Sequence, residues 1–185
     1  MNTAASGSSF TVPVALTIRP TTAEDLPKLE WFGQFTEHRE LIQDAFERQR
    51  RGENLMLQVV TTANGFPIGQ VWIDLERKRE AKTGLLWALR VIDCYQRMGI
   101  GTRLLAAAEA ELRRRGYRCA EIGAERDNPG ARRLYERLGY RVFGRDRHWY
   151  GYTTPWGERR RTLVDEWVMH KDLDGGGCTH RPQLG

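Results

Sequence analysis

The chain has 185 residues, 40% of them hydrophobic and 29% charged, which is the composition of one folded domain. Its net charge of +5 comes from basic residues scattered among acidic ones, which argues against a nucleic-acid-binding surface. The sequence lacks the run of about 20 apolar residues that a membrane-spanning helix needs. The small polar residues 1–9 lack the basic and apolar segments of a secretory signal, so no such signal is expected.

The three cysteines, Cys94, Cys119 and Cys178, are odd in number and widely spaced. This pattern predicts neither a disulfide framework nor a zinc site, and it makes a reducing cytoplasm the expected location. Cys119 precedes an apolar stretch, so we expect it to be a buried free thiol.

The first half of the chain is predicted to hold two helices and three strands. Thr22 can cap the first helix, which has acidic residues in its first turn, and Thr36 can cap the second. Asn64-Gly65 separates two β-rich runs and predicts a hairpin, because both residues tolerate a positive φ. The predicted elements are a strand at 14–19, a helix that starts at 23, a helix at 37–50, and strands at 55–61 and 68–75.

The second half begins with a nearly continuous apolar run at 85–92, which is typical of a central strand buried on both faces. Gly116 ends the long helix that follows. Asn128 caps a short helix with Pro129 at its first position, and Gly139 ends that helix. The predicted elements are a strand at 85–92, a helix at 99–115, a strand at 118–124, a helix at 129–138, and hairpin strands at 140–152 and 163–169.

The element order β-α-α-β-β-β-α-β-α-β-β predicts one α/β domain at residues 13–173, with a single sheet and helices on its faces. Residues 1–12 are expected to form a disordered leader. Residues 174–185, with three successive glycines, are expected to form a disordered tail.

Residues 96–102, which we call the phosphate turn, join the buried strand to the long helix. Backbone amides at a helix start lack intrahelical partners, and the helix dipole places partial positive charge there. Gly99 and Gly101 allow a bulky anion to approach the backbone, which suits a pyrophosphate. The turn lacks the Gly-Lys-Ser/Thr of a nucleotide P-loop, and Leu104 replaces the third glycine of the dinucleotide fingerprint. Taken alone, the turn is equally compatible with a structural glycine at a helix start.

The pattern around this turn resembles the GCN5-related N-acetyltransferase (GNAT) superfamily. In that superfamily a strand is followed by Arg/Gln-x-x-Gly-x-Gly/Ala and a long helix, and about 25 residues later by Asn, Ala, Leu-Tyr and Gly-Phe/Tyr. The matching residues are Gln96-Arg97-Met98-Gly99-Ile100-Gly101, then Asn128, Ala131, Leu134-Tyr135 and Gly139-Tyr140. The clear match covers about residues 85–144.

The resemblance implies an acyl-CoA N-acyltransferase fold, in which a single mixed, mostly antiparallel central sheet is flanked by helices. It also implies an acetyl-CoA-dependent N-acetyltransferase that uses acetyl-CoA as co-substrate and needs no metal. The strands at 90–92 and 122–124 would splay apart and admit the cofactor between them. The cofactor-binding residues so implied are Arg90, Val91, Ile92, Gln96, Arg97, Met98, Gly99, Ile100, Gly101, Thr102, Asn128, Ala131 and Tyr135.

Two residues depart from the family pattern. Gln96 stands where arginine is more usual, so a side-chain charge for the phosphates would come from Arg97 or Arg103. Asp93 stands where proline is common and places an acid near the anion site. The backbone amides of the turn do not depend on either side chain.

Tyr135 is the expected general acid, since a phenol with a pKa near 10 can protonate a thiolate of similar basicity. Packing alone is the alternative, because Tyr135 also falls on the apolar face of its helix. For the general base, some relatives use a glutamate on the strand before the turn, but residues 85–92 contain no acid. The candidates are Glu125 and Asp74, with Glu76, Asp165, His38 and His148 as further titratable groups near the expected site.

Aromatic residues around the first loop and the last hairpin favour a cationic or apolar acceptor, unless they only fill the core. We expect a small-molecule primary amine, with a protein N-terminus or lysine as the alternative. A CoA-binding sensor without catalysis is the alternative of another class. An acidic, closed pocket would favour a small amine, and an open groove would favour a peptide. A homodimer is compatible with the edge strands of the hairpin.

Overall fold

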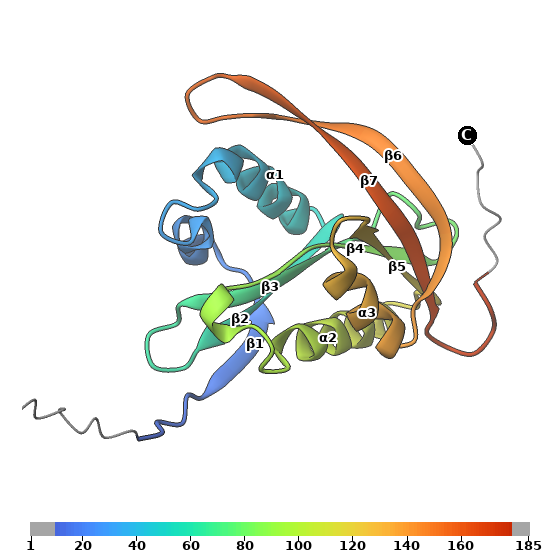
Figure 1. Cartoon of the computed structure of the whole chain (residues 1–185), viewed down its shortest axis with the longest axis horizontal. Coiled ribbons are helices and arrows are strands. Elements are labelled where there is room, and N and C mark those ends of the chain that lie inside the picture. Colours follow the sequence, from blue (N-terminus) through green and yellow to red (C-terminus); the bar gives the residue numbers. More distant parts are fainter. Residues whose placement is uncertain (1–9, 179–185) are drawn as a thin grey trace, which may run out of the picture.

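The central feature of the fold is one mixed sheet, which the computed structural model shows within residues 10–178 (Figure 1). Its seven strands lie in the order β1-β2-β3-β4-β5-β7-β6. All neighbours are antiparallel except β4 and β5. The strands are β1 Leu16–Pro20, β2 Asn54–Thr61, β3 Pro67–Asp74, β4 Thr83–Val91, β5 Cys119–Glu125, β6 Arg141–Thr153 and β7 Arg159–Asp172.

Helices cover both faces of the sheet, with α1 on one face and α2 and α3 on the other (Figure 1). The helices are η1 Ala23–Glu30, η2 Thr36–His38, α1 Arg39–Arg50, η3 Asp93–Tyr95, α2 Ile100–Arg114 and α3 Pro129–Arg137. The predicted element order and fold class are therefore confirmed. Within the part of the chain that the structure describes, none of these helices has the length and apolarity to cross a membrane.

The N-terminal helices differ in detail from the prediction. The first is a 3-10 helix, with Pro27 inside it and a capping box between Thr22 and Asp25. Thr36 does not cap the second helix, because its hydroxyl donates to Glu30 and residues 36–38 form a separate 3-10 turn. The α-helix therefore starts at Arg39 rather than at residue 37.

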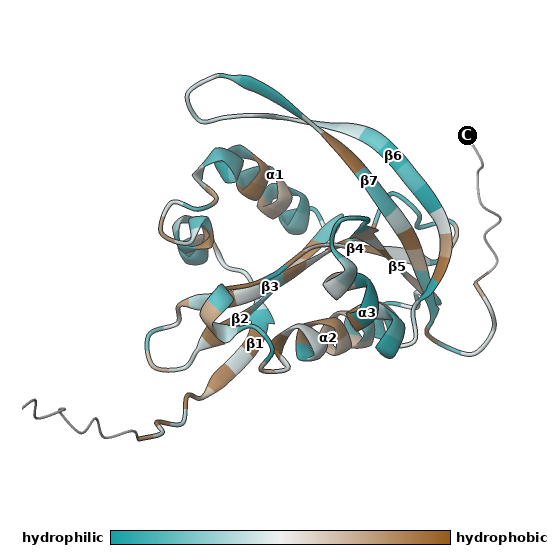
Figure 2. Cartoon of the chain, viewed as in Figure 1, coloured by the Kyte–Doolittle hydropathy of each residue, from teal (hydrophilic) through white to brown (hydrophobic). Residues whose placement is uncertain are grey.

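The main core lies between the sheet and α2. Apolar side chains of this helix pack on strands β2 to β5, and Leu104, Leu105 and Leu112 among them are fully buried. Figure 2 marks the hydrophobic residues of α2 in brown. Each such leucine stabilises the fold by about 1.5–3 kcal/mol. Gly69 on β3 lets α2 approach closely, since an added Cβ would lie 3.2 Å from both Ile100 and Leu104. This packing fixes the N-terminus of α2 beside the end of β4.

Strands β4 and β5 pair over only four residues each. The parallel register runs from Thr83 opposite Cys119 to Leu86 opposite Ile122 and ends there. Beyond that point β4 continues along β3, while β5 continues along β7. The two strands therefore separate, as the family resemblance implies.

The hairpin of β6 and β7 arches over the face that carries α1 (Figure 1). Its second strand begins at Arg159, four residues earlier than the apolar pattern indicates, because Thr153 and Arg159 already pair across the turn. Glu37 in η2 anchors the hairpin, because its carboxylate accepts hydrogen bonds from Tyr152 and Arg160 at 3.0 and 2.8 Å.

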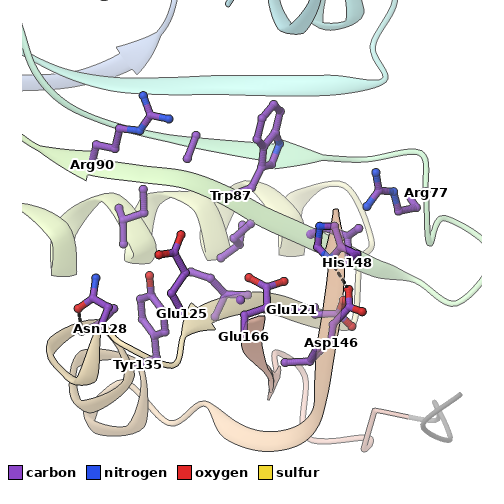
Figure 3. A pocket seen from close by; sticks show the side chains of 18 residues that line it. Arg77, Trp87, Arg90, Glu121, Glu125, Asn128, Tyr135, Asp146, His148 and Glu166 are labelled. Atoms are coloured by element: carbon purple, nitrogen blue, oxygen red, sulfur yellow. Dashed lines mark hydrogen bonds and ion pairs between the residues drawn. The ribbon is translucent and has the colours of Figure 1, made fainter. Parts of the chain in front are cut away.

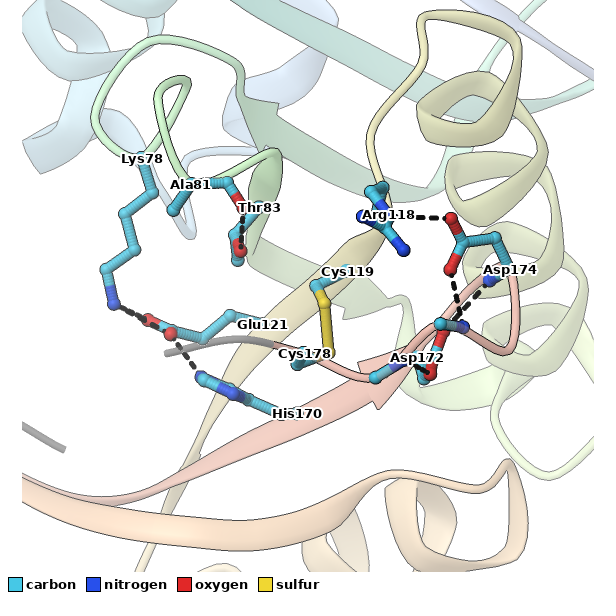
Figure 4. Close-up of a disulfide and its surroundings, with 12 residues drawn as sticks. Lys78, Ala81, Thr83, Arg118, Cys119, Glu121, His170, Asp172, Asp174 and Cys178 are labelled. Atoms are coloured by element: carbon cyan, nitrogen blue, oxygen red, sulfur yellow. Dashed lines mark hydrogen bonds and ion pairs between the residues drawn. A yellow bond between two sulfur atoms is a disulfide. The ribbon is translucent and has the colours of Figure 1, made fainter. Parts of the chain in front are cut away.

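A disulfide joins Cys119 to Cys178, so the prediction of a free Cys119 thiol is wrong (Figure 4). The two cysteines are 59 residues apart in sequence, but the turn after β7 brings them to a Cα–Cα distance of 5.7 Å. Cys119 pairs with Asp172 across the β5–β7 ladder. The Asp172 carboxylate accepts amide hydrogen bonds from Gly175 and Gly177, which folds residues 174–178 back toward β5.

The disulfide also removes the argument for a reducing compartment, so the cytoplasmic location stays a prediction without that support. The expected leader up to residue 9 and the expected tail from residue 179 lie outside the described residues. Cys94 is an exposed free thiol.

Removing the disulfide should lower the free energy of unfolding by about 2–4 kcal/mol, because a cross-link over a loop of this length restricts the unfolded chain. Urea denaturation of the Cys178→Ser variant without reductant measures the effect. The Cys94→Ser variant, which loses only an exposed thiol, should match the wild type. Identical midpoints for Cys178→Ser and the oxidised wild type would contradict the expectation.

Candidate active site

A cleft of about 420 Å³ opens where β4 and β5 separate (Figure 3). Side chains from β4, β5, α3, β6 and β7 line it. Predicted site residues that meet in this cleft are Arg90, Glu125, Asn128, Ala131 and Tyr135. The separation of the two strands thus creates the space into which these side chains point.

A bulge in β4 decides which side chains face the cleft. Ala88 and Leu89 together occupy the place opposite a single β3 residue, with Ala88 at a φ of 50°. Trp87 before the bulge and Arg90 after it pair with β3 residues two positions apart, so both lie on the α1 face of the sheet. Without the extra residue, Arg90 would point to the α2 face.

Four carboxylates, which we call the acidic wall, lie on the same face of the cleft: Glu121, Glu125, Asp146 and Glu166. Glu125, Glu166 and Asp146 lie in register across β5, β7 and β6. Glu121 precedes Glu125 by four residues on β5 and therefore shares its face. The acidic wall gives this side of the cleft a strong negative potential.

Two members of the acidic wall have basic partners. Glu121 accepts hydrogen bonds from Lys78 at 2.7 and 2.8 Å, and it also contacts the ring of His170 (Figure 4). These partners hold the pKa of Glu121 below its ordinary value, although burial alone would raise it. Asp146 lies 3.0 Å from Nδ1 of His148. Glu121 therefore has a cationic partner in Lys78, and Asp146 has the His148 imidazole beside it.

Glu166 has no ion-pair or hydrogen-bond partner among residues 10–178. Its carboxylate lies directly over Gly123, where any Cβ would overlap it. Burial raises the pKa of Glu166, and the negative charges of the other three acidic-wall residues raise it further against the opposing effect of His148. Glu166 is thus a partly buried carboxylate that binds a proton more readily than an ordinary glutamate.

The sequence pattern does not single out Glu166, although it offers the neighbouring Asp165 among several titratable candidates. Strand alternation places the two side chains on opposite faces. Asp165 forms an ion pair with Arg145 outside the cleft, and that pairing lowers its pKa. Gly123, the residue that makes room for Glu166, comes from another strand, so only the sheet register could have identified the pair.

Tyr135 reaches the cleft from α3 and is only 5% exposed. Its hydroxyl has no hydrogen-bond partner within the described part of the chain. Burial, together with the charges of Glu166 and Glu125, raises the pKa of Tyr135 to about 12. The phenol therefore keeps its proton at neutral pH and presents it to the cleft (Figure 3).

Asn128 caps α3 as predicted, since its side-chain oxygen accepts a hydrogen bond from the amide of Ala131 at 3.0 Å. This bond fixes the orientation of the side-chain amide. Its NH₂ group is left to donate into the cleft that the residue lines.

The phosphate turn is braced from within. The side chain of Gln96 donates to the carbonyl of Val91 at 3.1 Å and to the carboxylate of Asp93 at 2.8 Å. The two residues that depart from the family pattern therefore bind each other. Gln96 therefore stabilises the shape of the turn, and its side chain occupies one oxygen of the Asp93 carboxylate.

The amides of residues 97–102 donate to no acceptor within residues 10–178. The backbone turns through Arg97 at a φ of 62° and Gly99 at a φ of 79° before α2 begins. Arg97 and Arg103 are exposed and form no ion pair in the described structure. A run of free amides at a helix start, with two cations nearby, can bind a pyrophosphate.

Asp74 does not join the cleft. Its carboxylate accepts hydrogen bonds from Arg48 and from the amides of Glu76 and Arg77, all at 2.9 Å. Burial raises its pKa, but these contacts outweigh burial and leave the pKa below the ordinary value. We therefore assign Asp74 a structural contact at the end of β3 and keep Glu125 among the cleft carboxylates.

Comparison with known proteins identifies the family of this chain. The acetyltransferase (GNAT) family model matches residues 21–140, which is more than half of the chain. No curated protein sequence matches the chain significantly. Within residues 10–178, no group of three or more His, Cys, Asp and Glu residues could hold a metal ion.

Solved structures show the same fold. The ribosomal-protein-S18-alanine N-acetyltransferase of Escherichia coli is 24% identical, with a TM-score of 0.64 over 91% of this chain and 100% of that chain. YncA of Salmonella typhimurium, solved with its cofactor acetyl-CoA, is 22% identical, with a TM-score of 0.65 over 92% and 99% of the two chains. The PaiA N-acetyltransferase of Thermoplasma acidophilum, solved with coenzyme A, is 18% identical, with a TM-score of 0.62 over 85% and 99%.

The Glu166→Gln variant should be more stable than the wild type at pH 8 but not in acid. The folded-state pKa of Glu166 is raised, so the wild-type fold loses stability as the pH rises through that pKa, and a neutral glutamine does not. We expect Tm to be higher by about 2–4 °C at pH 8.

Thermal melts of Glu166→Gln between pH 4 and pH 8 measure this difference. The Glu80→Gln variant, which changes an exposed carboxylate outside the cleft, should show no such pH dependence. A Tm difference for Glu166→Gln that stays constant over this range would show that Glu166 has an ordinary pKa.

Proposed function

The chain belongs to the acetyltransferase (GNAT) family and is an acetyl-CoA-dependent N-acetyltransferase, and we propose that its acceptor is the primary amine of a small molecule. The observation that carries this proposal is the carboxylate of Glu166, which has no partner among residues 10–178 and lies near the phenol of Tyr135 in one cleft. The acidic wall around it would attract an ammonium group. The hairpin that arches over this face argues against a long peptide as acceptor.

The described residues fit the co-substrate. Amides 97–102 would hold the pyrophosphate, and Arg97 and Arg103 would supply positive charge. The edge of β4 at residues 90–92, where β5 no longer pairs with it, would bind the pantetheine arm by backbone hydrogen bonds. Asn128 would donate its free NH₂ group to the same arm. When bound, acetyl-CoA supplies an acetyl thioester that a neutral amine can attack directly.

We assign the proton transfers to two side chains. Glu166 accepts a proton from the acceptor ammonium, and Glu125 helps to hold that ammonium in the cleft. A raised pKa suits Glu166 to this task, because the base then lies closer to neutrality than an ordinary glutamate. Tyr135 donates its proton to the departing sulfur of coenzyme A and regains one from the acylated nitrogen, which loses that proton to become the neutral amide. Burial keeps the phenol protonated until that step.

The Gly101→Asp variant should lose coenzyme A affinity by about thirtyfold or more, since a carboxylate would then face the pyrophosphate. Isothermal titration calorimetry with coenzyme A measures the effect. Gly101→Ala is the matched control: an added Cβ would meet only Leu134 at 3.6 Å, so the affinity should stay close to that of the wild type. Normal coenzyme A binding by Gly101→Asp would exclude this turn as the pyrophosphate site.

The Tyr135→Phe variant should lower kcat by about a hundredfold, because the ring still packs while the proton is lost. Free thiol released from acetyl-CoA in the presence of a panel of amines measures the rate. Glu166→Gln should lower kcat/KM for the amine at neutral pH. Both variants should still bind coenzyme A.

This assay also tests the proposed function itself. Thiol release that is no faster with any amine than by hydrolysis alone would favour a coenzyme A-binding sensor. Turnover confined to peptides that present an N-terminus or a lysine would favour the protein acetyltransferase alternative.

A further inference from the structure

Arg90 is a partly buried cation that has no counter-ion among residues 10–178. Its side chain lies on the α1 face at one end of the cleft, and its guanidinium stacks on the ring of Phe35 at 4.1 Å. No carboxylate lies within ion-pair distance among residues 10–178. Burial lowers the pKa of Arg90, which reflects the cost of holding this charge in a poorly hydrated place. Such a charge normally has a partner.

The polar groups next to Arg90 also lack partners. The hydroxyl of Tyr150 and Nδ1 of His38 are both buried and form no hydrogen bond within the described structure. Burial and the charge of Arg90 lower the pKa of His38, which keeps the imidazole neutral with one N–H to donate. Burial raises the pKa of Tyr150, so its hydroxyl also stays a donor. We call Arg90, His38 and Tyr150 the anion corner.

The anion corner is enclosed by aromatic rings from two separate elements. The rings of Phe35 and His38 lie 6.2 Å apart, and those of His38 and Tyr152 lie 4.8 Å apart. The nearby carboxylate of Glu37 does not neutralise the corner, because it binds Tyr152 and Arg160 instead. Arg90, His38 and Tyr150 are therefore neighbouring polar side chains, and the buried polar atoms of His38 and Tyr150 have no hydrogen-bond partner among residues 10–178.

We propose that the anion corner binds a carboxylate of the acceptor, which makes the acceptor an amino acid. This inference rests on the proposed function and names the acceptor class of the same cleft. The ammonium of the acceptor lies at Glu166 and Glu125, while its carboxylate lies at Arg90. The cleft thus has an acidic side and a basic end that match the two charges of a zwitterion.

The neighbouring charges favour a carboxylate over a phosphate. The guanidinium fork matches the two oxygens of a carboxylate. The acidic wall lines the same cleft and would oppose a doubly charged phosphate group more strongly than a singly charged carboxylate. The phosphates of the co-substrate have their own site at residues 97–102, at the N-terminus of α2.

The test compares acids with their uncharged counterparts. The probes are the twenty common L-amino acids and their carboxamides, and the measured quantity is kcat/KM for each pair with acetyl-CoA. We expect the wild type to prefer the best amino acid over its carboxamide by roughly thirtyfold or more. This preference should fall to within about threefold in Arg90→Met, and Arg90→Lys should keep part of it.

Matched variants separate binding from folding. Arg77→Met changes another arginine that lines the cleft, outside the anion corner, and should keep the preference. Tyr150→Phe removes one unpartnered hydroxyl and should reduce the preference by about fivefold, and this variant decides the matter if Arg90→Met does not fold. Preference for a phosphorylated amine over the amino acids would overturn the carboxylate assignment.

The outcomes also separate this inference from the proposed function. Equal turnover of amino acids and their carboxamides by the wild type would contradict carboxylate binding at the anion corner. It would leave the proposed acetyltransferase function intact. Failure to acetylate any amine would overturn the proposed function itself. Unchanged preference in both Arg90→Met and Tyr150→Phe would place the recognition of the carboxylate elsewhere.

Discussion

The short parallel pairing between β4 and β5 is the constraint on which the rest of the site depends. Four residue pairs join the strands, and each strand then follows a different antiparallel neighbour. Because the core under α2 holds both strands from one side, the gap between them cannot close. The gap opens the cleft and leaves one edge of β4 without a strand partner. The N-terminus of α2 lies beside the end of the same strand.

Charge is arranged in the cleft by sheet register and by one bulge. Register aligns Glu125, Glu166 and Asp146 on neighbouring strands, so that the negative charges of Glu125 and Asp146 add to the effect of burial in raising the pKa of the partly buried Glu166. The bulge at Ala88 moves Arg90 onto the same face. A single inserted residue therefore decides whether the cleft has a basic end. The register alone would give only the acidic side of the cleft, and the bulge alone would give only its basic end.

Local signals predicted the local structure well. Asn128 and Pro129 marked the start of α3, Asn64-Gly65 marked a hairpin, and the spacing of Gly99 and Gly101 marked the start of α2, because each signal acts within a few residues. The two motifs together indicated the fold and the cofactor. These features need no knowledge of distant parts of the chain.

The features that the sequence did not predict depend on contacts that sequence patterns do not show. The disulfide joins Cys119 to a residue 59 positions away, and Glu166 gains its role from a glycine on another strand. Asp74 is near a strand end, as expected, but backbone amides of the following turn already occupy its carboxylate. In each case the deciding contact lies across the sheet or depends on backbone direction, and sequence spacing does not encode either.

The disulfide divides the molecule in a way that secondary structure does not. It closes residues 119–178 into a covalent ring, which contains β5, α3, β6 and β7. The acidic wall and Tyr135 belong to this ring, whereas Arg90 and the phosphate turn lie outside it. The cleft thus lies between the covalent ring and the rest of the chain. Any widening of the cleft moves the ring against the rest of the chain, and a protease that cuts the hairpin tip leaves both fragments joined by the disulfide.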